Sequence, residues 1–197
     1  MGEPAEELYR RALAAADEDA RLAMPPVHEW ETFPFEGDIR VRPLLPPVDA
    51  EPPRSGEGGV DCWRCRRGDS DAIWSDEHWL LSPLEKPSGL PVVLILEPRD
   101  HHDLDDLPES LARELGPLAQ RIERAVRAVG EIGRVHVCRW GDGSEHFHLW
   151  FMARPARVPQ LVGSFAAIWD DILPPLSEER WRANLAAVAA ALWNDRH

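Results

Sequence analysis

The decapeptide at residues 145–154, EHFHLWFMAR, constrains the fold of this chain most. In an extended strand, successive side chains alternate between the two faces. The even positions then carry His146 and His148, about 7 Å apart at roughly 3.3 Å per residue. The odd positions carry three apolar side chains, Phe147, Leu149 and Phe151. The segment therefore predicts a β-strand with one face in a core and two imidazoles on a shared surface, where they serve one substrate or divide a catalytic and a metal-binding role.

Charge and length limit the class of protein. With 197 residues, the chain is long enough for one domain with terminal extensions. Its formal net charge of -13 argues against a general nucleic-acid or anionic-membrane binder. Lys86 is the only lysine, so arginines supply nearly all the positive charge. Because a guanidinium binds phosphate in a bidentate manner, a small phosphate ligand remains compatible with this composition.

The number of cysteines and the hydropathy of the chain indicate the cellular compartment in which it is expected. The chain has three cysteines, an odd and small number that does not resemble a secreted disulfide framework. Its N-terminus is acidic and lacks the apolar run of a signal peptide. No segment approaches the roughly 18 consecutive apolar residues that a membrane span requires. We expect a cytoplasmic protein that does not enter a membrane.

The sequence suggests three regions. Residues 1–59 combine an Ala/Glu/Arg-rich helix at 3–23 with a proline-rich arm. Residues 60–155 have the patterns of a compact core. Residues 156–197 predict two further helices, at 158–173 and 177–194, and Ser177 begins the second of them. The arm and the C-terminal helices suggest no function by themselves.

Within the core, the patterns predict a small antiparallel sheet and one main helix. The helix spans 107–129, with Asp106 as its cap and a leucine-rich apolar stripe. The nearby Asp103 and Asp105 are interpreted as favourable charges at its start. Short apolar or β-branched runs predict four strands besides the two-histidine segment, at 72–74, 79–81, 91–97 and 134–139. The expected fold class is α+β.

His148 is the candidate nucleophile, because a neutral imidazole attacks phosphorus well. The alternative is that His146 and His148 are half-buried polar positions on an ordinary strand. The surrounding motifs favour the catalytic interpretation.

From Cys62 to Pro155, the order of motifs resembles the histidine triad (HIT) superfamily. A Cys-x-x-Cys pair is followed by an acidic turn, a strand ending in Pro-basic-x-His, an Asp-Leu-Pro helix start and a His-x-His strand. In this chain they are Cys62–Cys65, Ser75–Glu77, Leu94–His101, Asp106–Pro108 and His146–Met152. No single motif is specific, but their order is.

The resemblance implies a function. In the family, the middle histidine attacks the α-phosphorus of a nucleoside phosphate derivative, and a covalent nucleotidyl-histidine forms. His148 has that middle position, and His146 would orient it or bind a metal. The phosphate contacts would come from the 141–145 turn and four side chains, Arg139, Ser144, Trp150 and Arg154. The resemblance also implies a homodimer built through the main helix and the sheet edge.

Two departures from the family pattern affect this interpretation. The third triad histidine is Trp150 here, although the galactose-1-phosphate uridylyltransferase branch has a glutamine there and keeps the nucleophile. Arg139 replaces the asparagine usual before the glycine turn. The function expected is a nucleotidyl hydrolase or transferase. The alternatives are a catalytically inactive nucleotide binder and a zinc-stapled protein-interaction module.

A second group of residues suggests a metal-binding site. Cys62 and Cys65 provide half of a tetrahedral zinc site. The resemblance implies that His101 and His146 complete it, with His102 as a competitor of His101. A structural zinc ion would fix the N-terminal loop to the sheet. The alternative is a pair of free thiols or a redox dithiol.

Overall fold

The computed structural model describes residues 5–30 and 32–195. The chain divides into two compact units, residues 1–52 and 53–197, which are described separately. In the first unit, helix α1 spans Ala5–Ala14 and the 3-10 helix η1 spans Pro26–Glu29. The helix expected at 3–23 is therefore shorter, and the Asp17 carboxylate accepts the Arg21 N–H in the turn that follows it. The rest of the unit is largely irregular chain.

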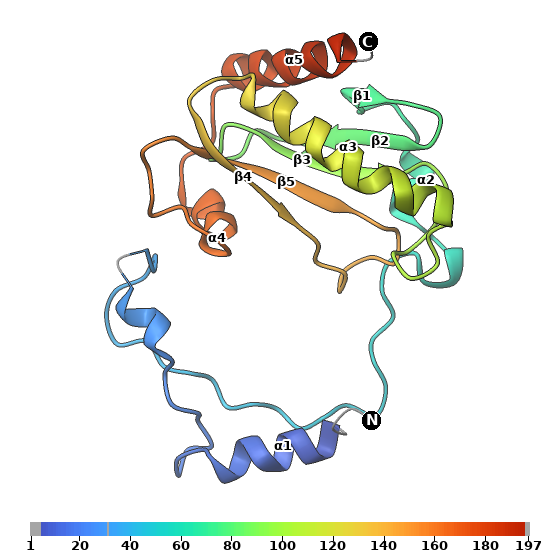
Figure 1. Ribbon diagram of the computed structural model, residues 1–197. Coiled ribbons are helices and arrows are strands. Elements are labelled where there is room, and N and C mark those ends of the chain that lie inside the picture. The colour runs from blue at the N-terminus through green and yellow to red at the C-terminus, as the bar shows by residue number, and fades with distance from the viewer. Residues whose placement is uncertain (1–4, 31, 196–197) are drawn as a thin grey trace. The chain divides into compact units, whose positions relative to one another are not determined.

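The second unit contains a five-stranded antiparallel sheet in the order β1-β2-β3-β5-β4. Figure 1 shows this sheet with its covering helices. The strands are β1 Trp74–Ser75, β2 Trp79–Pro83, β3 Val93–Pro98, β4 Ile132–Cys138 and β5 Leu149–Pro155. The α+β class is thus present, and each of the five strands overlaps a predicted strand region.

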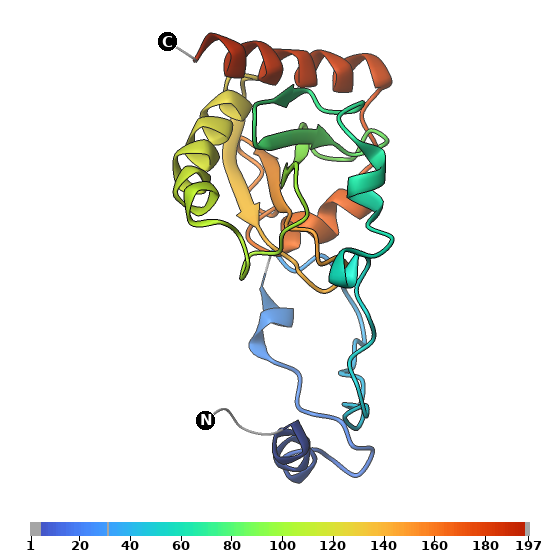
Figure 2. The ribbon, with the colours of Figure 1, turned by 90° about the vertical axis from the view of Figure 1, so that its right-hand side faces the viewer.

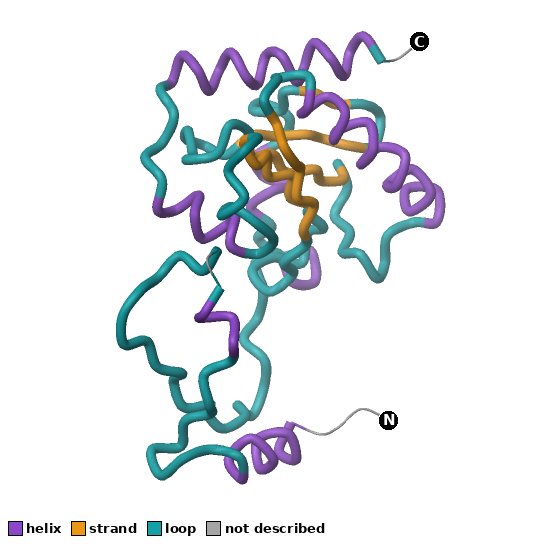
Figure 3. Tube along the Cα trace, turned by 60° about the vertical axis from the view of Figure 1, so that its left-hand side comes forward, coloured by secondary structure: helices purple, strands orange, loops and turns teal. Residues whose placement is uncertain are grey.

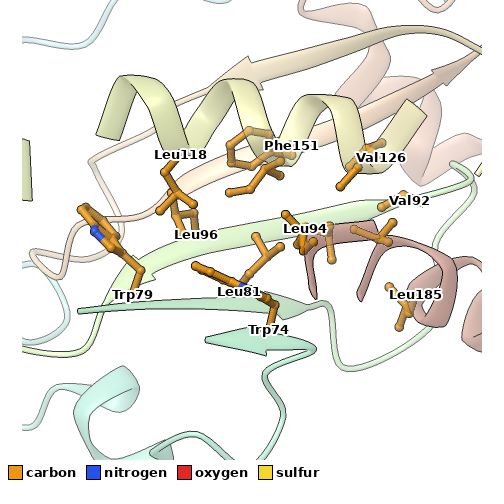
Figure 4. Close-up of a cluster of buried hydrophobic side chains, with 14 of the residues drawn as sticks. Trp74, Trp79, Leu81, Val92, Leu94, Leu96, Leu118, Val126, Phe151 and Leu185 are labelled. Carbon is orange, nitrogen blue, oxygen red and sulfur yellow. The ribbon is translucent and has the colours of Figure 1, made fainter. Parts of the chain in front are cut away.

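Helix α3, Glu109–Arg127, covers one face of the sheet and creates the main core. Its apolar stripe buries Leu118, Ile122 and Val126 against the sheet, as the periodicity predicts. Figure 4 shows Leu118 and Val126 of this stripe above Leu96 and Leu94, with Phe151 between the two helical residues. The expected cap is wrong, however. Pro108 precedes the first helical turn without a side-chain cap, and the Asp106 carboxylate instead accepts the Asp103 N–H.

A smaller apolar cluster lies on the opposite face of the sheet. Leu90, Val93, Met152 and Leu161 are buried in it. Helix α4, Phe165–Ile172, contributes Ala167 and Trp169 to this cluster. Figure 2 shows the sheet between α3 and α4. This second cluster lies on the face that the sequence assigns to the histidines.

The remaining helices frame the sheet. The 3-10 helix η2 spans Glu57–Gly59, and helix α2 spans Trp63–Arg67. Helix α5, Glu178–Asn194, packs beside α3 (Figure 3), and the Ser177 side chain accepts the Arg180 N–H as its cap. Residues 53–59 and the C-terminal helices belong to the same compact unit as the core, so the boundaries expected at 60 and 155 do not coincide with the observed division.

The two-histidine segment departs from the expected strand. β5 begins only at Leu149, so His146 and His148 lie in the irregular chain before it. The Phe147 N–H donates to the His102 carbonyl at 2.6 Å, which holds this segment against the loop after β3. As a result, the two imidazoles have different surroundings instead of a common strand face.

Among the described residues, no helix combines the length and apolar character needed to cross a bilayer.

Candidate functional site

Four potential metal ligands converge beside the sheet. They are Cys62, Cys65, His101 and His146, and their ligand atoms all lie within 4.8 Å of one another. Nδ1 of His146 lies 3.5 Å from each cysteine Sγ, and Nδ1 of His101 lies 3.5 Å from Cys65 Sγ. His102 is not part of this cluster, so the structure favours His101 in the choice left open by the sequence.

The spacing of this cluster fits tetrahedral zinc. Zinc binds thiolate at about 2.3 Å and imidazole nitrogen at about 2.0–2.1 Å, so a tetrahedral S···N edge measures about 3.5 Å. All three S···N distances given above are 3.5 Å. Two thiolates also neutralise the charge of a divalent ion. The cluster is therefore compatible with a structural zinc site.

Local structure places each ligand. Cys62 is the N-cap of α2, and its Sγ accepts the Cys65 N–H at 3.5 Å, so one short turn presents both sulfur atoms on the same side. His101 follows β3 after a short loop. His146 reaches the cluster because the segment before β5 is held against the 101–102 loop.

The second nitrogen of each histidine has a hydrogen-bonding partner. Nε2 of His146 lies 2.9 Å from the Pro98 carbonyl, and Nε2 of His101 lies 3.4 Å from the Glu145 carboxylate. Such outer contacts fix the ring orientation and the tautomer of a metal-binding histidine, leaving Nδ1 as the ligand atom. The arrangement is thus typical of a metal site rather than of free thiols beside two surface histidines.

Burial changes the titration of two ligands in the metal-free chain. Burial lowers the pKa of His146 to about 4, against the opposing contact with the Pro98 carbonyl. Burial, together with the neighbouring Cys62 thiol, raises the pKa of Cys65 to about 11. His146 is therefore a neutral ligand at pH 7, whereas metal binding must displace the proton of Cys65.

The metal-free protein is expected to lose stability as the pH falls from about 6.5 to about 4. A histidine whose folded pKa is depressed stabilises the fold fully above the unfolded pKa, and protonation in the unfolded chain removes that contribution. For His146, which is buried, the loss approaches about 3 kcal/mol over this window. Urea unfolding of chelator-treated protein across this range measures it.

The comparison requires a control, because Glu97 acts in the opposite direction. Burial raises the pKa of Glu97 to about 7, so that group favours folding as the pH falls through this range. The difference between wild type and His146→Gln isolates the histidine. Equal pH slopes for the two proteins contradict the expectation.

His148 lies apart from the metal cluster. Its Nδ1 is 2.8 Å from the His146 carbonyl oxygen, and its Nε2 is 2.6 Å from the Trp140 carbonyl oxygen. The first contact orients the ring so that Nε2 is the nitrogen turned away from its own segment. His146, which the sequence assigns both a catalytic and a metal role, is directed to the cysteines and almost fully buried. The two histidines thus have separate surroundings.

The turn before β5 carries an arginine–aspartate network that sequence reasoning missed in part. Asp103, expected to support the start of the helix, instead accepts hydrogen bonds from Arg54 and Arg139. Burial alone would raise the pKa of Asp103, but the hydrogen bonds from Arg54, from the Leu104 N–H and from Arg139 outweigh it and lower the pKa. Arg139 therefore lies next to the turn, as expected, but its guanidinium is already paired with the Asp103 carboxylate.

Ser144 and the turn donors are occupied by the chain itself. The Ser144 hydroxyl donates to the Ser55 carbonyl at 3.3 Å, and the Glu145 N–H donates to the same carbonyl at 3.0 Å. Ser55 N–H in turn donates to the Gly143 carbonyl. Two of the donors expected to hold a phosphate, the Ser144 hydroxyl and the Glu145 N–H, therefore bind Ser55, and the proline-rich composition of that region gave no signal for this contact.

Trp150 lies on the second sheet face beside the His148 segment. It packs against the cluster of Leu90 and Met152, and its ring meets that of Trp140 edge-on at 5.8 Å between centroids. Its buried Nε1 has no hydrogen-bond partner among the described residues. Trp150 therefore contributes apolar surface to this sheet face and, among the described residues, an indole donor without a partner.

The structure places Arg154, expected to contact phosphate, near the far end of β5. Arg154 lies five residues beyond Leu149, about 16 Å along β5 at the rise of a strand. Its guanidinium donates to the Val158 carbonyl at 3.0 Å. The side chain is therefore held at the opposite end of the strand from His148.

A buried ionic group supports the helix that carries the cysteines. Arg64, within α2, is almost fully buried and pairs by distance with Glu97 at 3.1 Å and with Asp71 at 3.6 Å. Neither contact has hydrogen-bond geometry, so charge accounts for the pairing. The arrangement fixes α2 to β3.

Arg64→Ala is expected to destabilise the second unit by about 3–5 kcal/mol, because it leaves two carboxylates without their buried cation. Arg66→Ala is the matched control on the same helix, since its pair with Asp61 is exposed. Chemical unfolding of the three proteins measures the difference. An Arg64→Ala variant as stable as the Arg66→Ala variant contradicts the expectation.

Comparison with known proteins identifies the fold. The sequence matches no protein-family model and no curated protein. A histidine triad protein from Bradyrhizobium japonicum is similar in structure, with a TM-score of 0.50, 18% identity, and 66% of this chain and 96% of that chain covered. Histidine triad proteins from Marinobacter aquaeolei VT8 and Sinorhizobium meliloti 1021 also align with TM-scores of 0.50 and 17% identity. They cover 66% and 65% of this chain and 93% of their own chains.

The second unit therefore has the histidine triad fold, as the ordered motifs predict. Because the sequence identity is low, these comparisons establish the architecture alone. The activity is inferred from the residues of the site.

Proposed function

We propose that the core binds a nucleoside phosphate derivative and transfers its nucleotidyl group through His148. Nε2 attacks the α-phosphorus, a P–N bond forms, and the bond from phosphorus to the leaving group breaks. The leaving group departs with the bonding electron pair. Water or another acceptor then forms a P–O bond, loses its proton and releases the histidine.

The observation that carries this proposal is the setting of His148 within a histidine triad fold. The contact between Nδ1 and the His146 carbonyl, 2.8 Å long, leaves Nε2 as the nitrogen that would attack once the Trp140 carbonyl moves away from it. Arg139 and the 139–145 turn lie beside it. We propose that Trp150 occupies the place of the third triad histidine and adds an apolar surface and an indole N–H to the leaving-group side.

The alternative is an inactive nucleotide-binding or protein-interaction module. Two contacts favour it: Trp150 packs into an apolar cluster, and the Trp140 carbonyl lies against Nε2 of His148. In that case the protein binds nucleotide without releasing product.

Nucleotide release from a panel of substrates separates the two functions. The panel comprises adenylyl and guanylyl phosphoramidates, dinucleoside polyphosphates and nucleotide sugars, with nucleotide binding measured in parallel by calorimetry. Release of a nucleoside monophosphate from one class supports nucleotidyl transfer and identifies the leaving group. Binding without release from every class supports the inactive module.

We further propose that zinc binds Cys62, Cys65, His101 and His146 in a structural role. When bound, the ion would link α2, the loop after β3 and the segment before β5. The cysteines must remain reduced to serve as ligands, which supports a cytoplasmic location.

Finally, we propose a homodimer formed through α3 and β4. β4 is the last strand of the sheet, so one of its edges has no neighbouring strand within the described unit. Light scattering after gel filtration tests this proposal. A mass twice that of the chain supports it, and the mass of a single chain contradicts it.

A further inference from the structure

Both ring nitrogens of His148 face carbonyl oxygens. Nδ1 lies 2.8 Å from the His146 oxygen, and Nε2 lies 2.6 Å from the Trp140 oxygen. At these distances a carbonyl oxygen occupies the space in front of each nitrogen. Attack on phosphorus at Nε2 therefore requires the Trp140 carbonyl to move away.

The Trp140 carbonyl belongs to the 139–145 turn, and Arg54 forms hydrogen bonds to this turn and to the loop before α3. Arg54 Nη1 donates to the Gly141 carbonyl at 3.1 Å and to the Asp103 carboxylate at 2.6 Å. Its Nη2 lies 3.6 Å from the Glu145 carboxylate. One guanidinium therefore contacts both ends of the turn and the loop before α3, and charge-assisted hydrogen bonds of this kind are among the stronger ones in proteins.

The Arg139 guanidinium also contacts this turn. Arg139 binds the other oxygen of Asp103. The Arg139 guanidinium also lies over Gly141, where an added Cβ would come within 2.6 Å of Nη1. An added side chain at Gly141 would therefore require the end of the Arg139 side chain to move. Residues 139–141 are thus fixed between two arginines that share one buried carboxylate.

Residues 54–58 connect this turn to the metal cluster. Gly58 N–H donates to the Glu145 carboxylate at 2.6 Å, and the same carboxylate oxygen lies 3.4 Å from Nε2 of His101. Gly56 packs against Cys62 and His101 in the left-handed region, with φ of 79°. The segment therefore contacts both the metal ligands and the turn beside His148.

We propose that Arg54 is a positioning residue that holds the Trp140 carbonyl against Nε2 and so keeps His148 in a capped, unreactive state. Arg54 acts through the 139–141 turn, and movement of that turn exposes the nitrogen. The functional meaning of the cap rests on His148 as the proposed nucleophile, but the contact itself requires no substrate.

Labelling with diethyl pyrocarbonate at pH 7 tests this proposal in the full-length protein, because the reagent acylates imidazole nitrogens that offer a lone pair. Peptide mass spectrometry follows His148, with the exposed His28 as a reference and the β4 residue His136 as a reporter of general loosening. In wild type, His148 should react more slowly than His28. Arg54→Ala should accelerate labelling of His148 by about fivefold to tenfold, the effect expected for loss of one hydrogen bond, with His136 unchanged.

Arg66→Ala is the matched control, because it removes an exposed arginine paired only with Asp61. It should leave labelling of His148 at the wild-type rate. If Arg54→Ala does not fold, Arg54→Gln carries the same expectation, since it keeps a polar side chain but loses the charge that binds Asp103.

Three results would overturn the proposal: wild-type His148 reacting as fast as His28, no acceleration in the Arg54 variant, or an equal acceleration at His136. Because labelling uses no nucleotide, these results are distinct from a failure to detect nucleotidyl transfer.

Discussion

Cys65→Ala is expected to lose stoichiometric zinc and to lower the thermal unfolding temperature by about 10 °C or more. The substitution removes one of four ligand atoms that lie within 4.8 Å of one another. The remaining three ligands come from the loop before α2, the loop after β3 and the segment before β5, and each of these depends on the others for its position. Metal analysis and scanning fluorimetry of the purified protein measure both effects.

Cys138→Ala is the matched control for that substitution. Cys138 is the third cysteine of the chain, lies at the end of β4 and is not part of the cluster. It should keep the full zinc content and nearly the wild-type unfolding temperature. A Cys65→Ala variant with one zinc ion per chain and the stability of Cys138→Ala would show that the cluster is not a zinc site.

His148→Asn is expected to reduce nucleotide release by roughly a thousandfold or more, because no other side chain replaces a lost covalent nucleophile. Asparagine still offers an amide donor to the His146 carbonyl, so the local chain should keep its path. Nucleotide affinity should change little, since the imidazole contributes mainly to the chemical step. Initial rates and binding isotherms for the two proteins separate these effects.

His78→Asn provides the comparison for this variant, because His78 lies in the turn between β1 and β2. Its release rate should equal that of wild type. Equal loss in both variants would indicate a folding defect, and full activity of His148→Asn would exclude His148 as the nucleophile.

Local patterns predict the elements whose side chains repeat regularly. The stripe of α3, the β-branched run of β3 and the Ser177 cap of α5 are all observed. In each, a short stretch of sequence contains the determining contacts: a helical period, a buried strand and a side chain bonded three residues away.

The path of the segment before β5 could not be predicted from alternation alone. His146 to His148 have strand-like periodicity, but the Phe147 N–H binds the His102 carbonyl, and His146 turns towards the cysteines. These partners are distant in sequence, so the pattern of the segment itself cannot indicate them.

The surroundings of His148 could likewise be predicted only in part. Arg139 can be identified next to the glycine turn, but its partner Asp103 and the second arginine, Arg54, come from remote loops. For Arg154, position in the motif does not give position in space, because the strand carries it about 16 Å beyond Leu149.

A search for a covalent nucleotidyl-histidine tests the proposed transfer through His148 most directly. Wild type and His148→Asn are mixed with the substrate class that gives release, quenched in alkali because a P–N bond to histidine is labile in acid, and measured as intact proteins. We expect one added nucleotidyl mass on wild type, located at His148 by fragmentation, and none on the variant. Continued release by wild type with no adduct at the earliest times, or an adduct on both proteins, would contradict nucleotidyl transfer through His148.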